Sequence, residues 1–143
     1  MKTVVTKCNQ SLFALRLMRQ HGMQQSALQT VFKATSISKL LYAAPSWWGY
    51  ITNATLECLE DFIRRAKKFG YYNPTDPDVK TLCTSADDCL FKRVLSNPAH
   101  VLRPYLPPQR PIVYALRKRP HNYALPRKDN RNFLNRMLFR DVY

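Results

Sequence analysis

The sequence predicts a mainly α-helical protein: a small bundle of three to four helices, followed by a basic, proline-rich extension. Early in the chain, apolar residues recur every three or four positions, which is the spacing of one helix face. The chain has three glycines but ten prolines, and most of the prolines follow residue 73. We therefore expect a helical domain over residues 1–70 and an extension over residues 71–143, in which the pattern allows a short β-hairpin and a terminal helix.

Two helices are expected before residue 44. The apolar stripe of the first, over residues 4–21, consists of Val5, Cys8, Leu12, Leu15 and Met18. Gly22 suits the left-handed position that often ends a helix. Residues 24–43 carry a second apolar side, but serines near Thr35 compete for backbone hydrogen bonds. The second helix is therefore expected to kink or break near Thr35.

A third helix over residues 53–69 has the clearest pattern. Thr52 or Asn53 can cap its start, and Gly70 follows its end. Acidic residues lie in its first half and cations in its last turns, the order that the helix dipole favours. The cations are Arg64, Arg65, Lys67 and Lys68. Because they gather at one end of a helix, they form a candidate site for a phosphate backbone.

Residues 40–48 are the most apolar stretch and contain both tryptophans. Pro45 stops a helix that enters this stretch, because proline lacks the N–H that a helix needs. Trp47 and Trp48 are large aromatics that are costly to leave in water. We expect a packed corner between the second and third helices, which would direct the cations of the third helix toward a partner.

The chain after residue 70 begins with a linker, residues 71–81, where proline, asparagine and aspartate favour turns. A fourth helix is expected over residues 85–96. Ser85 would be its cap, with Asp87 and Asp88 in its first turn.

The rest of the extension offers few regular elements, since five prolines fall within residues 98–111. Residues 112–116 and 123–125 could pair as two strands of a hairpin. Asp129 could cap a final helix over residues 130–140.

Charge is the strongest indication of function. The chain has 23 lysines and arginines against nine acids, a formal net charge of +14. Such an excess exceeds what solubility requires and indicates a polyanionic partner, most simply nucleic acid. No apolar run approaches the roughly 20 residues of a membrane span. The N-terminus has no secretory leader pattern, so we expect an intracellular chain with four reduced cysteines and no membrane partner.

Catalytic and metal-binding alternatives fit the sequence less well. Asp87 and Asp88 could be read as the paired carboxylates of a polymerase, but no aromatic residue or strand pattern precedes them. Cys83, Cys89 and His100 lack the close pairs typical of zinc sites. No nucleophile lies beside a histidine, and scattered glycines cannot form a phosphate loop. We expect no catalytic residue, no metal, no cofactor and no small-molecule substrate.

The C-terminal arm is a second candidate for nucleic-acid binding, because its cations are interleaved with aromatic residues. Cations neutralise phosphates, and aromatic or guanidinium planes stack on unpaired bases. The alternative is a solvated tail or an arm that packs on another domain. The candidate residues of the arm are Arg117, Lys118, Arg119, Arg127, Lys128, Arg131 and Arg136.

The order of several motifs resembles the C-terminal region of reverse transcriptases of non-LTR (LINE-like, jockey-like) retrotransposons. In that family the region begins with a helix of the type seen here at residues 7–16, and a second helix ends in a Tyr-Ala-x-x-x-Trp signature, matched here at residues 42–47. A Leu-Glu-x-x-x-Arg-Arg-Ala run then spans residues 59–66. Further similar segments occupy residues 90–102, 106–108, 116–122 and 131–133.

The resemblance implies that residues 1–70 form a thumb, which grips the duplex of template and primer, and that residues 71–143 form the region after it. Fingers and palm, with the catalytic aspartates of an RNA-directed DNA polymerase, are not in this sequence. The chain alone is therefore expected to bind RNA, DNA or their hybrid without catalysis, and the palm of a parent polymerase is a second expected partner. The alternative is a non-functional relic of a degenerate mobile element.

Overall fold

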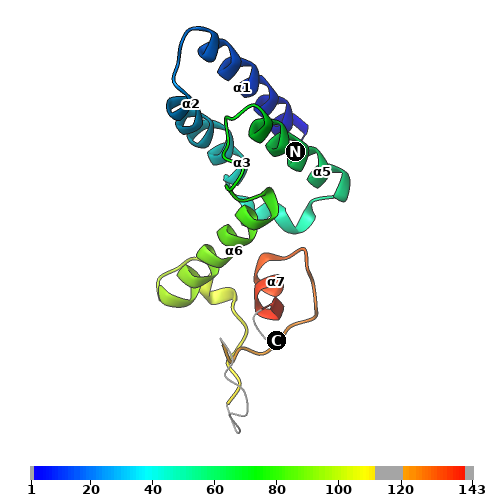
Figure 1. Cartoon of the computed structure of the whole chain (residues 1–143). Coiled ribbons are helices and arrows are strands. Elements are labelled where there is room, and N and C mark those ends of the chain that lie inside the picture. Colours follow the sequence, from blue (N-terminus) through cyan, green and yellow to red (C-terminus); the bar gives the residue numbers. More distant parts are fainter. Residues whose placement is uncertain (1, 112–120, 141–143) are drawn as a thin grey trace. The chain divides into compact units, whose positions relative to one another are not determined.

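The computed structural model describes residues 2–111 and 121–140 and is mainly helical, as the sequence predicts (Figure 1). Only one isolated antiparallel bridge, between Gln109 and Tyr123, occurs in the described part, and no strand or sheet. The first expected strand, residues 112–116, lies outside the described residues. None of the described helices is long and apolar enough to cross a membrane. The elements are α1 (Lys2–Gln20), α2 (Gln25–Phe32), a π turn (Lys33–Ile37), α3 (Ser38–Leu41), α4 (Ala44–Trp47), a 3-10 turn (Trp48–Tyr50), α5 (Asn53–Lys68), α6 (Val79–Ser96), a second 3-10 turn (Arg103–Tyr105) and α7 (Phe133–Arg140).

The chain forms two compact units, which divide it differently from the expected boundary at residue 70. The first unit comprises Met1–Ala44 and Ile51–Cys83, and the second comprises Pro45–Tyr50 and Thr84–Tyr143. The expected linker packs in the first unit because Tyr71 and Tyr72 are buried there. The expected corner over residues 40–48 is divided between the units, since residues 40–44 belong to the first unit and both tryptophans belong to the second.

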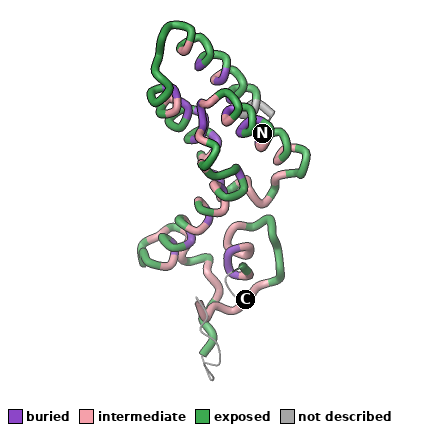
Figure 2. Tube along the Cα trace, in the orientation of Figure 1, coloured by how far each residue is buried: buried purple, intermediate pink, exposed green. Residues whose placement is uncertain are grey.

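The first unit packs α1, α2 and α5 around apolar side chains, and the buried residues lie along the facing sides of these helices (Figure 2). Phe32 contacts Phe62 and Tyr72, with ring centroids 5.7 and 5.5 Å apart. Of the expected stripe on α1, Cys8, Leu12 and Leu15 are buried, Met18 is exposed, and the side chain of Val5 lies outside the described residues.

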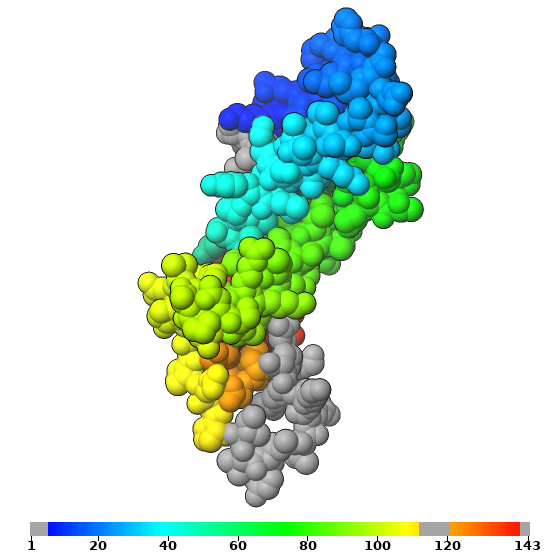
Figure 3. Space-filling model, turned by 90° about the vertical axis from the view of Figure 1, so that its left-hand side faces the viewer, coloured from blue at the N-terminus to red at the C-terminus, as the bar shows by residue number. Residues whose placement is uncertain are grey.

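The helix ends follow the expected glycines. Gly22, at φ +86°, ends α1. The N–H of Gly22 donates to the carbonyl oxygen of Arg19, and the N–H of Met23 donates to that of Met18. The turn that follows lies at one end of the first unit (Figure 3). Gly70, at φ +76°, ends α5 in the same way.

The start of α5 and the kink of the second helix also follow the sequence. Thr52 caps α5, since its Oγ1 accepts a bond from the Thr55 N–H at 3.3 Å. The predicted kink near Thr35 is a π turn over Lys33–Ile37 that joins α2 to α3.

The expected start of the fourth helix at Ser85 is wrong. α6 begins at Val79 because Asp78 caps it: its Oδ1 accepts the Thr81 N–H at 2.8 Å. Asp87 and Asp88 therefore lie in the middle of a helix.

The cap of the last helix is also displaced from Asp129. Asn132 caps α7, as its Oδ1 accepts the N–H groups of Leu134 and Asn135 at 3.0 and 3.4 Å. Asp129 instead accepts the N–H of Arg131 in the preceding turn.

The second unit has its own apolar core, centred on Phe91 of α6 and on Met137 and Leu138 of α7. Partly buried side chains surround it, including Phe133, whose ring centroid is 6.5 Å from that of Phe91. These contacts hold α7 on α6, so the terminal helix is part of a core and not a free tail.

Candidate nucleic-acid interface

The C-terminal half of α5 presents cations on two adjacent faces. Arg64 and Lys68 are four residues apart and lie on one stripe, while Arg65 starts the next. The side chain of Arg64 is 76% exposed and pairs with Asp61 at 2.6 Å between Nη2 and Oδ1. The side chain of Lys68 is exposed and makes no hydrogen bond or ion pair with the described residues. These head groups can reach a phosphate without rearrangement of the helix.

Lys67 has a different environment from its neighbours. Its Nζ donates to the carbonyl oxygens of Pro74 and Asp76 at 3.0 and 2.6 Å. It also lies 5.7 Å from the ring centroid of Tyr72. Lys67 therefore holds the loop after α5 against the helix and is less available to a phosphate than Arg64 or Lys68.

A groove between α1 and α5 lies beside this cationic helix end and has a volume of about 540 Å³. Arg65 lies at its wall and donates from Nη2 to Oδ1 of Asn9 at 2.9 Å. The lining residues from α1 and the start of the next loop are Asn9, Leu12, Phe13, Arg16, Arg19, Gln20 and Tyr71, and those from α5 and its end are Arg65 and Phe69.

Arg19 is fixed at the end of this groove by three contacts. Its guanidinium carbon lies 4.4 Å from the ring centroid of Tyr71. Its Nη2 donates to the carbonyl oxygen of Phe69 at 2.7 Å and to Oε1 of Gln25 at 2.9 Å. The groove therefore carries a positive charge whose position is set by the fold.

Three of the candidate cations of the arm are exposed in the described part of the chain. Arg127, Lys128 and Arg131 are exposed and lie in the second unit. Their side chains donate no hydrogen bond to the described residues. Arg117, Lys118 and Arg119 lie outside the described residues.

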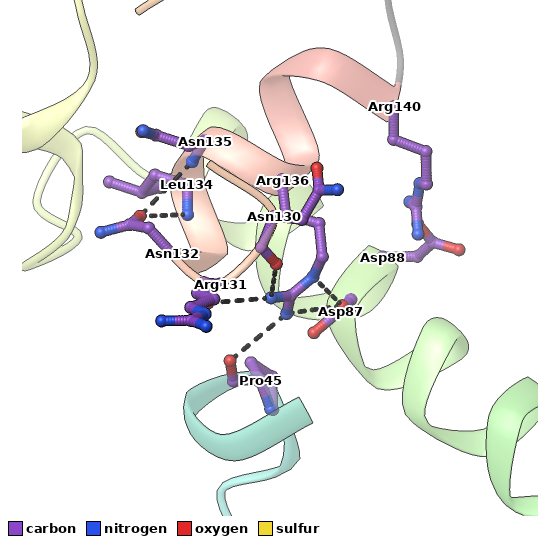
Figure 4. A network of polar contacts seen from close by, with 10 residues as sticks. All are labelled: Pro45, Asp87, Asp88, Asn130, Arg131, Asn132, Leu134, Asn135, Arg136 and Arg140. Atoms are coloured by element: carbon purple, nitrogen blue, oxygen red, sulfur yellow. Dashed lines mark hydrogen bonds and ion pairs between the residues drawn. The ribbon is translucent and has the colours of Figure 1, made fainter. Parts of the chain in front are cut away.

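Arg136 is committed to contacts within the chain. Its guanidinium binds Oδ2 of Asp87 from Nε at 3.1 Å and from Nη2 at 2.9 Å (Figure 4). It also donates to the carbonyl oxygens of Asn130, Arg131 and Pro45. A phosphate could bind this guanidinium only by displacing these partners.

The two neighbouring carboxylates of α6 are both paired with cations of α7. Asp87 is 2% exposed and holds Arg136, and Asp88 pairs with Arg140. Burial raises the pKa of Asp87, and the bonds from Arg136 oppose this effect. The carboxylates thus join two helices of the second unit, whereas the sequence predicted them in the first turn of a helix.

The described cysteines and histidines do not assemble a metal site. None of the four cysteines forms a disulfide; Cys83 is buried while Cys89 is exposed. His100 accepts the Leu102 N–H at Nδ1. Within residues 2–111 and 121–140, no three histidine, cysteine, aspartate or glutamate side chains gather where they could hold a metal ion.

The groove was not found from the sequence, although a signal for it was present. Asn9, Phe13, Arg16 and Gln20 recur at helical spacing on a face of α1 other than the buried one. Phe13, an aromatic residue on a helix face that also carries Arg16, was the signal for this groove.

Comparison of the chain with protein-family models, curated proteins and solved structures found no match.

Proposed function

We propose that this chain binds nucleic acid through the exposed cations of α5 and of the C-terminal arm. The observation that carries the proposal is the cationic end of α5, where Arg64, Arg65 and Lys68 project from adjacent helix faces. Lysine and arginine side chains that gather on one surface can neutralise several phosphates of a nucleic-acid backbone. The net charge of +14 gives long-range attraction in the same direction.

Binding by this surface is electrostatic and tolerant of sequence. Each cation that neutralises a phosphate releases a condensed counterion, so affinity decreases steeply as salt increases. Arg64 can exchange Asp61 for a phosphate at small cost, since an exposed ion pair is worth only about 0–1 kcal/mol. Lys67 and Arg136 would support the interface by holding a loop and a helix in place.

The resemblance gives this binding a biological setting. We propose that the first unit acts as a thumb that grips the template–primer duplex of a non-LTR retrotransposon reverse transcriptase. The second unit would then be the region after the thumb, with Arg127, Lys128 and Arg131 as further phosphate contacts. The catalytic aspartates of such a polymerase belong to the palm, so the residues of this chain are assigned grip and not catalysis.

The test is a salt titration of binding by fluorescence anisotropy, with labelled DNA duplex, RNA–DNA hybrid and single strand as probes. The variant Arg64→Gln/Lys68→Gln should weaken binding to every probe and reduce the log–log salt slope on duplex by about 0.9 for each lost phosphate contact. The matched control is Lys92→Gln/Arg93→Gln, which removes two exposed cations from one turn of α6. Absence of binding at low salt, or an equal loss in the control, would contradict the proposal.

A further inference from the structure

Two aromatic side chains are exposed at the groove between α1 and α5. Phe13 is 64% and Phe69 is 49% exposed, although both line a concave surface. Burying either ring in the core would have stabilised the fold, so their exposure calls for a physical reason. Aromatic faces exposed beside cations are the surfaces on which unpaired bases stack.

The charge around these rings has one sign. Arg16, Arg19 and Arg65 line the groove, and none of its lining residues in the described chain is acidic. On α5, the carboxylate of Asp61 is paired with Arg64. The side chain of Arg16 is exposed and makes no hydrogen bond or ion pair with the described residues. An anionic group that enters the groove therefore meets an available guanidinium and no opposing carboxylate.

The groove is also held in shape before any ligand arrives. Asn9 fixes Arg65 from α1, and Arg19 lies on Tyr71 while it binds the carbonyl of Phe69. These contacts join α1 to both the side and the end of α5. Its volume of about 540 Å³ is within the roughly 300–1,000 Å³ range of ligand sites.

We propose that this groove holds one unpaired nucleotide of a single strand, with its base against Phe13 or Phe69 and its phosphate beside Arg16 and Arg65. The inference rests on the proposed function and refines it, because it adds a site that distinguishes single strands from duplexes. Bases inside a duplex are stacked on one another and cannot reach an aromatic side chain in a groove. The strand that leaves a gripped duplex would supply such a nucleotide.

The experiment uses the whole chain and three labelled probes: an oligodeoxythymidine, an abasic strand of equal length, and a blunt duplex. Phe13→Ala should weaken oligodeoxythymidine binding by about fivefold or more, as expected for the loss of one base stack. Binding to the abasic strand and the duplex should stay unchanged. The control is Tyr105→Ala, which removes another exposed aromatic, 75% exposed, from the second unit. It should leave all three affinities unchanged.

A second variant separates the phosphate contact from the base contact. Arg16→Gln should weaken oligodeoxythymidine and abasic strand alike and reduce their salt slope by about 0.7. If Phe13→Ala changes none of the affinities, or all of them equally, the nucleotide site is overturned while the proposed function stands. If the wild-type chain binds no probe at low salt, both fail. Loss in Phe13→Ala of binding to an acidic leucine-containing peptide, with oligodeoxythymidine binding retained, would assign the groove to a peptide and overturn the inference.

Discussion

Replacement of Arg136 by methionine removes the cation that compensates the buried carboxylate of Asp87. Methionine fills a similar volume and is a good helix former, so the change in α7 is mainly electrostatic. Asp87 would lose both of its bonds from Arg136, at 2.9 and 3.1 Å. Three backbone carbonyls, including that of Pro45, would lose a donor as well. The second unit should therefore be destabilised.

The magnitude follows from the burial of the two partners. Removing one member of a buried ion pair costs about 3–5 kcal/mol, because the other charge stays buried without compensation. Asp87 is 2% exposed, but the side chain of Arg136 is 15% exposed, so solvent already screens the pair in part. We expect a loss near the lower end of that range, about 3 kcal/mol in the free energy of unfolding of the second unit.

The loss should depend on pH in a defined direction. Burial already raises the pKa of Asp87, and without Arg136 the larger of the two opposing cationic effects is lost, while that of Arg140 remains. A carboxyl whose pKa is higher in the folded state binds more protons when folded, so its contribution to stability falls as pH rises through the folded pKa. Arg136→Met should therefore be most destabilising at neutral pH and less so in mildly acidic solution.

Tryptophan fluorescence during urea unfolding measures this effect, since both tryptophans belong to the second unit. The double variant Asp87→Leu/Arg136→Met should recover much of the lost stability, because it leaves no buried charge. A loss below about 1 kcal/mol in Arg136→Met would refute the reasoning. So would strictly additive effects in the cycle with Asp87→Leu.

Two further predictions concern backbone features. Gly49→Ala would force a methyl group against the carbonyl of Arg131 and the guanidinium of Arg136, so the tryptophan-detected transition should lose about 1–3 kcal/mol. Gly22→Ala strains a positive-φ position of the first unit, so it should leave the tryptophan-detected transition of the second unit unchanged. Asp78→Ala should cost about 1 kcal/mol by circular dichroism. The bond from Thr81 lowers the pKa of Asp78, so this difference should be present at neutral pH and disappear as pH falls through the folded pKa; a pH-independent difference would contradict it.

Local signals predicted the helices of the first unit well. Gly22 and Gly70 end helices where the chain needs a positive φ, and Thr52 caps α5. Each of these signals acts within a few residues, so the sequence contains all that is needed to interpret it. The cations at the end of α5 were found for the same reason, since helical spacing alone places Arg64 and Lys68 on one stripe.

Interactions between distant residues could not be predicted in this way. Asp87 and Arg136 are 49 residues apart, and no local pattern indicates that one neutralises the other. The start of α6 was misplaced because Ser85 and Asp78 are both plausible caps, and the burial of Val79 and Cys83 favours the earlier one. The groove likewise depends on the packing of α1 on α5, which brings Asn9 beside Arg65.

The candidate cations therefore differ in ways that net charge cannot reveal. A guanidinium or ammonium group that already donates to carbonyl oxygens must lose those bonds before it can bind a phosphate, and buried bonds to charged groups are worth about 1.5–3 kcal/mol each. Lys67 and Arg136 are in this position. Arg65 is exposed, but it donates to the carbonyl oxygen of Asp61 and to Oδ1 of Asn9. The exposed candidates whose side chains donate to no carbonyl oxygen of the described residues are Arg64, Lys68, Arg127, Lys128 and Arg131. The total charge indicates that the partner is anionic, whereas the bonds within the fold decide which cations can contact it. These bonds leave Arg64 and Lys68 at the end of α5 available to a phosphate.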